Sequence, residues 1–256
     1  MPSDLTPLLA EDVGIQVGDG SMPLWRNKHG TLIHRIGVFG NIKEDKEYFR
    51  NIVIPTKNKL FNLKLNLYYH KSAGTCYIKF ESKAVMTFYF TSIGLQWGKK
   101  VETYIPDIIF NSTKEIKSAF MRGLADTDFC LSFKKNFKGK YSDPYIQLGC
   151  SSNILVRQCS KILKSLGITS TKILDSKEYD KRTDKFYIKN YLFIHGKKNL
   201  KKWMESIGFH NPVHFTKYDI WKKFGFCPPR TKLQQRIDTL EGNADISNLC
   251  NNSSTF

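Results

Sequence analysis

Alternating apolar and polar residues predict two adjacent strands in the second half of the chain. In the first strand, one side carries Phe129, Leu131, Phe133 and Phe137, and the other carries Cys130, Ser132, Lys134, Asn136, Lys138 and Lys140. In the next segment, Ile146 and Leu148 alternate with Tyr145 and Gln147. Because successive side chains of a strand point to opposite faces, both strands should have one buried face and one polar, basic face.

The first half of the chain repeats this alternation. A shift of 109 positions places Met22 and Leu24 on the core side, and Pro23, Trp25, Asn27 and His29 on the opposite side. The later segments divide in the same way. The predicted core side holds Leu32, Ile36, Val38, Leu63, Leu65, Leu67, Cys76, Ile78 and Phe80, and the polar side holds Arg35, Lys64, Asn66, Tyr68, Tyr77 and Lys79.

Similar short sequence segments recur in the same order in both halves of the chain, which indicates a duplication. Residues 9–20 read LAEDVGIQVGDG and residues 118–129 read SAFMRGLADTDF, each a helical stretch ending in an aspartate. Those aspartates lie 109 positions apart, and the later words SIGL (92–95) and SIGF (206–209) lie 114 apart. The order of these segments predicts an α/β (α+β) fold with antiparallel sheets. It should consist of two pseudo-symmetric α-β-β-α-β-β-α halves, residues 1–98 and residues 99–230. The polar segment 231–256 is expected to be a mobile tail.

Small residues one turn apart predict that the two aspartate-ending helices pack together. Gly14 and Gly18 on the first helix should face Gly123 and Thr127 on the second, because glycine lets two backbones approach closely. Asp19 and Asp128 would then lie side by side at helix C-termini, where the helix dipole disfavours negative charge. Two close carboxylates need cations between them, and their hard oxygens suit Mg²⁺.

The charge balance favours an anionic partner. Lys and Arg number 40 against 23 Asp and Glu, a formal net charge of +17. Such an excess is typical of nucleic-acid binding, although a merely soluble basic protein is the plain alternative. A sheet face of Lys, Arg, Asn, Gln and Tyr can donate to phosphates and read base edges, so we expect the two sheets to form a DNA-binding saddle.

Other protein classes are disfavoured. The most apolar stretch, near residues 85–95, is too short to span a bilayer, and no signal-peptide pattern begins the sequence, so we expect an intracellular protein without membrane contact. The six cysteines have no metal-ligand spacing and are expected to be reduced thiols.

The two motifs resemble the paired signature helices of the LAGLIDADG homing endonucleases. The nine-residue family motif falls on Asp12 to Gly20 and on Met121 to Phe129. The segments IPDIIFNSTKEIKSAFMRGLADTD and IGFHNPVHFTKYDIWKKFGFCPP are similar to segments of archaeal intron-encoded members. The resemblance covers roughly residues 8 to 229.

This resemblance implies a single-chain, monomeric, intron-encoded nuclease that makes a metal-dependent double-strand break in a long DNA target. Asp19 and Asp128 would be catalytic and would bind Mg²⁺, with the carbonyl groups of Gly18 and Thr127 as further ligands. Mn²⁺ is an alternative ion, and Ca²⁺ is expected to support binding without cutting. The residues expected to contact DNA are Trp25, Asn27, His29, Arg35, Lys64, Lys79, Ser132, Lys134, Asn136, Lys138, Lys140, Tyr145 and Gln147.

The sequence departs from the family pattern in two places. Phe129 replaces the glycine that usually ends the motif, whereas Gly20 keeps it. Members usually supply a Gln or Lys from a strand end to polarise the attacking water. Asn41 and Lys43 are the catalytic candidates in the first half, but residues 149–153 of the second half offer no lysine. The two DNA strands are therefore expected to be cut at different rates.

Two alternative functions share the same fold. An RNA maturase would bind its host intron RNA on the basic saddle and would not need the aspartates. A non-catalytic DNA-binding protein, or a nickase, is the other alternative. Retention of both aspartates favours the endonuclease, because binding alone gains nothing from carboxylates that face phosphate.

Overall fold

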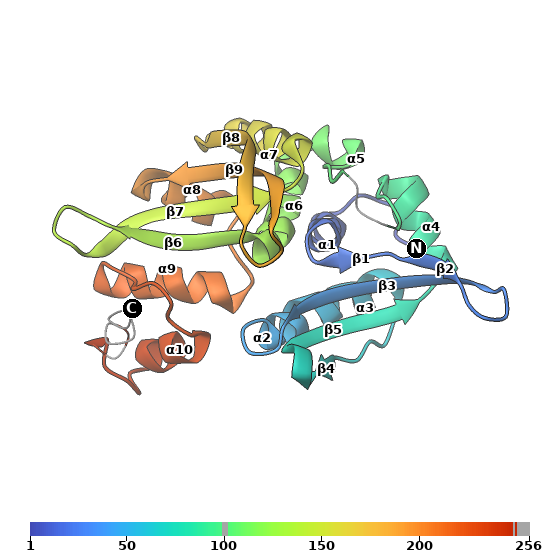
Figure 1. Ribbon diagram of the computed structural model, residues 1–256, viewed down its shortest axis with the longest axis horizontal. Helices are drawn as coiled ribbons and strands as arrows, with labels where there is room; N and C mark the ends of the chain where they lie inside the picture. Colours follow the sequence, from blue (N-terminus) through green and yellow to red (C-terminus); the bar gives the residue numbers. More distant parts are fainter. Residues whose placement is uncertain (99–101, 248, 250–256) are drawn as a thin grey trace.

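The computed structural model describes residues 1–98, 102–247 and 249. Two αβ halves lie on either side of a central helix pair, α1 (Pro7–Val17) and α6 (Lys114–Asp128) (Figure 1). The fold is mixed α/β with two antiparallel sheets, as the sequence predicts. The predicted boundary between the halves falls at residue 99, which lies outside the described residues. A new helix begins at Asp107, directly after Pro106.

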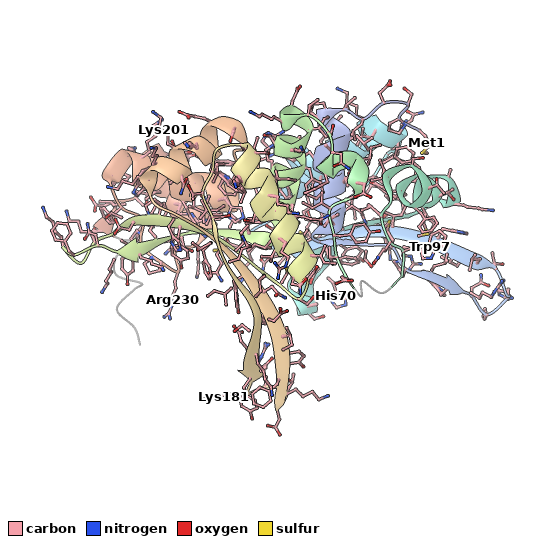
Figure 2. The ribbon with its side chains drawn as sticks, turned by 90° about the horizontal axis from the view of Figure 1, so that it is seen from above. Met1, His70, Trp97, Lys181, Lys201 and Arg230 are labelled. Atoms are coloured by element: carbon pink, nitrogen blue, oxygen red, sulfur yellow. The ribbon has the colours of Figure 1, made fainter. Side chains whose placement is uncertain are left out.

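The second half is one α-β-β-α-β-β-α unit. Its elements are α6 (Lys114–Asp128), β6 (Phe129–Lys135), β7 (Tyr141–Cys150), α7 (Asn153–Ser165), β8 (Thr171–Asp180), β9 (Lys185–His195) and α8 (Lys197–Ser206), preceded by the short α5 (Asp107–Phe110). The sheet order is β6-β7-β9-β8, with all neighbours antiparallel. The hairpin of β8 and β9 projects from the body of the molecule, with Lys181 near its tip (Figure 2).

The first half follows the same path with more interruptions. Its strands are β1 (Gly20–Ser21), β2 (Leu24–Arg26), β3 (Leu32–Asn41), β4 (Tyr68–His70) and β5 (Thr75–Glu81), in the order β1-β3-β5-β4 with β2 also on β3. Its helices are α1 (Pro7–Val17), α2 (Lys46–Tyr48), η1 (Phe49–Val53), α3 (Ile54–Phe61), η2 (Lys71–Ala73), α4 (Lys83–Phe88) and η3 (Tyr89–Ile93). The sheet order is the same in both halves, so the predicted pseudo-symmetry is confirmed at the level of topology.

The first hairpin of each half closes with the same turn. The Oδ1 atoms of Asn27 and Asn136 each accept hydrogen bonds of 2.9 and 3.0 Å from the backbone N–H groups two and four residues later. Gly30 and Gly139 complete the turns at φ +79° and +74°, a conformation that favours glycine. Both pairs are separated by 109 positions, the same offset as the two aspartates.

The predicted strand phase holds in β6 and β7. Phe129, Leu131, Phe133, Ile146 and Leu148 are all buried. Phe129 packs on Trp203 of α8, with ring centroids 5.7 Å apart. Helices therefore cover the apolar face of this sheet and leave the polar face open.

Three predictions about the strands need correction. Phe137 is 94% exposed, because it lies in the hairpin turn and not on the core face. Leu32, at the far end of β3, is 39% exposed, since it pairs with Arg26 near the tip of its hairpin. Residues 63–67 alternate in burial as predicted but form no strand, because β4 begins only at Tyr68.

Helices α9 (Pro212–Phe224) and α10 (Leu233–Glu241) extend the fold beyond the repeated unit. The prediction of a mobile tail from residue 231 is wrong for α10. Arg236 is fully buried, donates to Thr216 Oγ1 (2.9 Å) in α9, and its Nη2 lies 3.9 Å from Glu44 of the first half. The polar composition hid this helix, because its main anchor is a buried arginine. Residues 248 and 250–256 of the predicted tail lie outside the described residues.

No helix in the described part of the chain is long and apolar enough to cross a membrane.

Candidate catalytic centre and nucleic-acid interface

Helices α1 and α6 pack backbone against backbone, as the glycine spacing predicts. A Cβ atom on Gly14 would lie 2.7 Å from the backbone nitrogen of Leu124 and would overlap the Phe120 carbonyl oxygen. A Cβ atom on Gly123 would overlap the Glu11 carbonyl oxygen in the same way. One turn further along, Gly18 faces the side chain of Thr127. Only hydrogen atoms fit between the two helices at these positions.

This packing brings the two acidic helix ends together. Asp128 is the last residue of α6, and Asp19 follows the end of α1 by two residues. The Asp128 carboxyl carbon lies 3.4 Å from the place that a Cβ on Gly18 would occupy, so this carboxyl group sits beside the residue that precedes Asp19. The backbone of Asp19 is fixed to the first sheet by a hydrogen bond of 3.2 Å from Phe39 N–H to its carbonyl oxygen.

The two carboxylates impose a negative potential on their surroundings. The pKa of Cys150, at the end of β7, is raised by burial and further by Asp128. The pKa of the buried Tyr48 phenol is raised well above its usual value by burial first, then by Asp126 and Glu11, and after them by Asp19. Oxygen donors in such a potential suit a hard divalent cation, so the donor set of Asp19, Asp128 and the carbonyl groups of Gly18 and Thr127 fits Mg²⁺.

The catalytic candidates Asn41 and Lys43 lie at the end of β3. Asn41 Oδ1 accepts the backbone N–H groups of Lys43 (2.8 Å) and Glu44 (3.2 Å), so this oxygen holds the turn into α2. The Lys43 side chain is exposed. Of the two candidates, Lys43 is therefore the one whose polar group is open to a phosphate or a water molecule.

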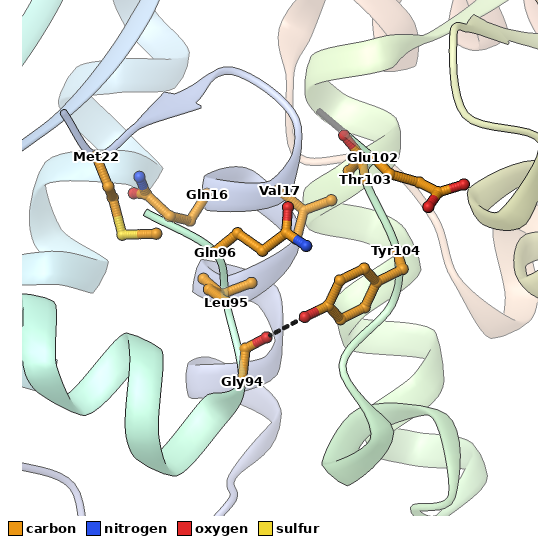
Figure 3. Close-up of a pocket in the computed structure, with 9 residues that line it drawn as sticks. All are labelled: Gln16, Val17, Met22, Gly94, Leu95, Gln96, Glu102, Thr103 and Tyr104. Atoms are coloured by element: carbon orange, nitrogen blue, oxygen red, sulfur yellow. Dashed lines mark hydrogen bonds between the residues drawn. The ribbon is translucent and has the colours of Figure 1, made fainter. Parts of the chain in front are cut away.

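The segment that connects the two halves, of which residues 94–98 and 102–104 are described, packs beside the end of α1. This segment is called the connector. A pocket there is lined by Gln16, Val17, Met22, Gly94, Leu95, Gln96, Glu102, Thr103 and Tyr104 (Figure 3). Tyr104 OH donates to the Gly94 carbonyl (3.0 Å), and Ser152 Oγ donates to the Thr103 carbonyl (2.5 Å). The connector is thus tied to both halves close to the two acidic helix ends.

On the second sheet, the polar face lies where the sequence places it. Lys134 is exposed and its ammonium group lies 4.9 Å from the centre of the Tyr145 ring. Ser132 and Gln147 are partly exposed on the same face. Lys138 and Lys140 are exposed around the hairpin turn, whereas the Asn136 side chain is engaged within that turn.

On the first sheet, some of the predicted DNA-contacting residues are engaged by neighbouring groups of the protein, and others are exposed. Arg35 stacks on Trp25 (4.5 Å) and pairs with Glu81 (2.7 Å), which offsets part of its charge. Lys79, Lys64 and His29 are exposed, although Lys64 lies in a loop before β4 and His29 in the hairpin turn. Asn27, like Asn136, uses its side-chain oxygen to close its turn.

Sequence reasoning missed a row of stacked rings on each polar face. Phe39, Tyr77 and Tyr68 stack at 5.7 Å intervals on the first sheet. On the second sheet the row consists of Tyr145, His195, Phe193 and Tyr191, with spacings of 5.7–6.2 Å. The alternation in residues 190–195 could have revealed the second row, since Asn190, Leu192 and Ile194 are buried while the residues between them are not.

Together these features define a class of protein. Its chain is duplicated into two αββαββα halves, and glycine-packed helices join the halves and bring two aspartates together between two open sheet faces. Comparison with known proteins agrees. Residues 115–208 match the LAGLIDADG-like domain family. No curated protein sequence matches the chain.

Several solved structures share the fold at low sequence identity. I-DmoI in complex with DNA and Mn has a TM-score of 0.56 at 16% identity, covering 80% of this chain and 98% of that one. The I-LtrWI LAGLIDADG homing endonuclease bound to target DNA has a TM-score of 0.55 at 14% identity, covering 97% and 98%. A mutant of I-SmaMI has a TM-score of 0.54 at 14% identity and covers 100% of both chains.

Residues 115–208 therefore form a LAGLIDADG-like domain, and the chain has the fold of the single-chain LAGLIDADG homing endonucleases. An archaeal origin stays a prediction.

Proposed function

We propose that this protein is a monomeric, site-specific homing endonuclease that cuts both strands of a long duplex DNA target with divalent metal ions. The observation that carries the proposal is that Asp19 and Asp128 converge at the ends of two glycine-packed helices. The two sheets beside them each have one polar face. Carboxylates that face phosphate weaken binding unless they hold metal, so their placement favours catalysis over binding alone.

The sheets would hold the DNA. Lysine and arginine side chains on the polar faces, such as Lys79 and Lys134, can contact phosphates, and Gln147 can read base edges in the major groove. The structural neighbours I-DmoI and I-LtrWI were solved bound to DNA, which supports a DNA target for this chain.

The residues at the helix ends would carry the chemistry. Asp19 and Asp128 would hold Mg²⁺ or Mn²⁺, together with the carbonyl oxygens of Gly18 and Thr127. Such ions, when bound, activate water and stabilise charge on the phosphate and the leaving oxygen. Lys43 would donate a hydrogen bond toward the attacking water in the first half. Residues 149–153 contain no lysine, so we expect the two strands to be cut at unequal rates.

The test is cleavage of a plasmid that carries the joined flanks of the gene's insertion site. Wild-type protein should cut both strands with Mg²⁺ or Mn²⁺ and should bind without cutting in Ca²⁺. Asp19→Asn and Asp128→Asn should each reduce the cleavage rate at least 100-fold, on the order of the loss of one strongly placed catalytic group. Specific binding should be unchanged or slightly tighter, because a charge facing phosphate is removed. Asp107→Asn, at an exposed position on α5, is the matched control and should cut like wild type.

Metal-dependent double-strand cleavage that survives in the double Asp19→Asn, Asp128→Asn variant would refute the mechanism. Absence of cleavage by the wild type, with tight binding to the host intron RNA, would identify a maturase instead. Tight DNA binding without cleavage would identify a non-catalytic DNA-binding protein.

A further inference from the structure

Two buried carboxylates and one imidazole converge where α1, α6 and the start of α9 meet. Glu11 of α1 and Asp126 of α6 are 4% and 3% exposed, and His210 immediately precedes the N-cap of α9. One ligand atom from each of the three residues lies within 4.8 Å of the other two. The side chain of His210 is 42% exposed, so the group is open to solvent on one side.

The hydrogen bonds of these residues leave ligand atoms facing one another. Arg122 binds Glu11 Oε2 through Nε (3.1 Å) and Nη2 (2.8 Å), which turns Oε1 toward Nδ1 of His210 at 2.6 Å. Both oxygens of Asp126 accept the backbone N–H of His210, at 3.0 and 3.1 Å, and its Oδ1 also accepts that of Asn211. Backbone donors hold this carboxylate in place without neutralising it.

More negative charge faces the group from the first half. Asp45 accepts a hydrogen bond of 2.9 Å from Nδ2 of Asn211, the residue that also contacts Asp126. Three carboxylates, Glu11, Asp126 and Asp45, therefore crowd this junction, and the ion pairs that reach Glu11 come from Arg122 and His210. Buried carboxylates in such a group are costly unless a cation accompanies them.

A buried phenol lies within the electrostatic influence of the same carboxylates. Tyr48 is 2% exposed, and its buried hydroxyl group has no hydrogen-bond partner among the residues that the structure describes. The charges that reach this hydroxyl come, after the effect of burial, first from Asp126 and Glu11, and then from Asp19 and Asp45. A buried hydroxyl without a partner is costly, so a further polar group within its reach would stabilise it.

We propose that Glu11, Asp126 and His210 bind a divalent transition-metal ion of the Zn²⁺ class. Imidazole combined with carboxylate oxygens favours Zn²⁺ and its neighbours over Mg²⁺, which takes oxygen ligands. The ion would take Glu11 Oε1, His210 Nδ1 and one oxygen of Asp126, and the proton now shared by Glu11 and His210 would leave to solvent.

This site shares no ligand with the pair of catalytic aspartates. Glu11 precedes Asp19 by eight residues, whereas Asp126 precedes Asp128 by two. Its three ligands come from α1, α6 and the segment that leads into α9, so a bound ion would join both halves and the C-terminal helices. The expected role is structural.

The test uses untagged protein, stripped with a chelator, in the Asp19→Asn, Asp128→Asn background, so that neither catalytic carboxylate nor DNA takes part. Titration with Co²⁺ should give visible d–d absorption that saturates near one equivalent and is displaced by Zn²⁺. Zn²⁺ should also raise the Tm of this variant. Adding His210→Gln should weaken Co²⁺ binding at least tenfold and abolish the Tm increase, whereas His70→Gln, at an exposed histidine of β4, should change neither.

The His210→Gln variant is expected to fold, because the backbone N–H of residue 210 still binds Asp126 and the side chain is 42% exposed. No Co²⁺ absorption in the background variant, or an affinity that is unchanged by His210→Gln, would overturn the proposal. Neither outcome depends on DNA cleavage, so the two proposals fail independently.

Discussion

Replacing Gly123 by alanine tests the central helix contact most directly. The added methyl group would overlap the Glu11 carbonyl oxygen and would lie 2.9 Å from that carbonyl carbon and 3.1 Å from the Ile15 nitrogen. These are backbone atoms of α1, so no side chain can rotate away. Relief requires the two helices to separate by roughly 1 Å, given the usual separation of about 3.5–4 Å between carbon atoms.

The magnitude follows from two opposing effects. Overpacking costs about 1–3 kcal/mol, and a rigid backbone neighbour places this case at the upper end. Alanine in a helix gains up to about 1 kcal/mol over glycine, which offsets part of that cost. We therefore expect a net loss of about 2 kcal/mol in the free energy of unfolding, and a Tm lower by roughly 4–8 °C for a chain of this length.

The assay is urea and thermal unfolding of Gly123→Ala, Gly14→Ala and the double variant, with Ser118→Ala on α6 as the matched control. Both glycines lie in one contact, so once the helices have separated the second substitution should cost less than the first. Ser118→Ala should change stability by less than about 0.5 kcal/mol. Gly123→Ala with wild-type or higher stability, as helix propensity alone predicts, would refute the backbone contact.

Three further predictions concern charge and assembly. Lys138→Ala should reduce the salt slope of DNA binding by about one unit, whereas Arg35→Ala should reduce it by less, because Glu81 already pairs with that arginine; equal slopes for both variants and wild type would contradict the assigned DNA face. Burial lowers the pKa of His214 to about 3, so its contribution to stability is complete above its unfolded pKa of 6.5 and should fall by about 2 kcal/mol at pH 5. Between pH 7 and pH 5, unfolding should therefore show wild type losing about 2 kcal/mol more stability than His214→Asn loses. Sedimentation of the free protein should show a monomer, since both signature helices are on one chain; an obligate dimer would count against it.

Patterns with a fixed period were predictable from the sequence. The alternation of residues 129–148 gave the correct buried face of the second sheet, and the glycine spacing gave the correct helix contact, because each depends on local geometry. The 109-residue offset holds for the aspartates and for the hairpin turns of Asn27 and Asn136, which the same duplication explains.

Features that depend on distant partners were not predictable. The buried Arg236 and the group around Glu11 each join segments far apart in the sequence, and no local period marks such contacts.

The contacts of Arg236 and Asn211 with the first half have a consequence for how the protein is made. Glu44 and Asp45 emerge early from the ribosome, whereas Arg236 follows Glu44 by 192 residues. The turn after β3 therefore cannot acquire these partners until residues 211 and 236 have been synthesised. The two halves should accordingly reach their final stability together, and a truncation before α10 should weaken the half that was synthesised first.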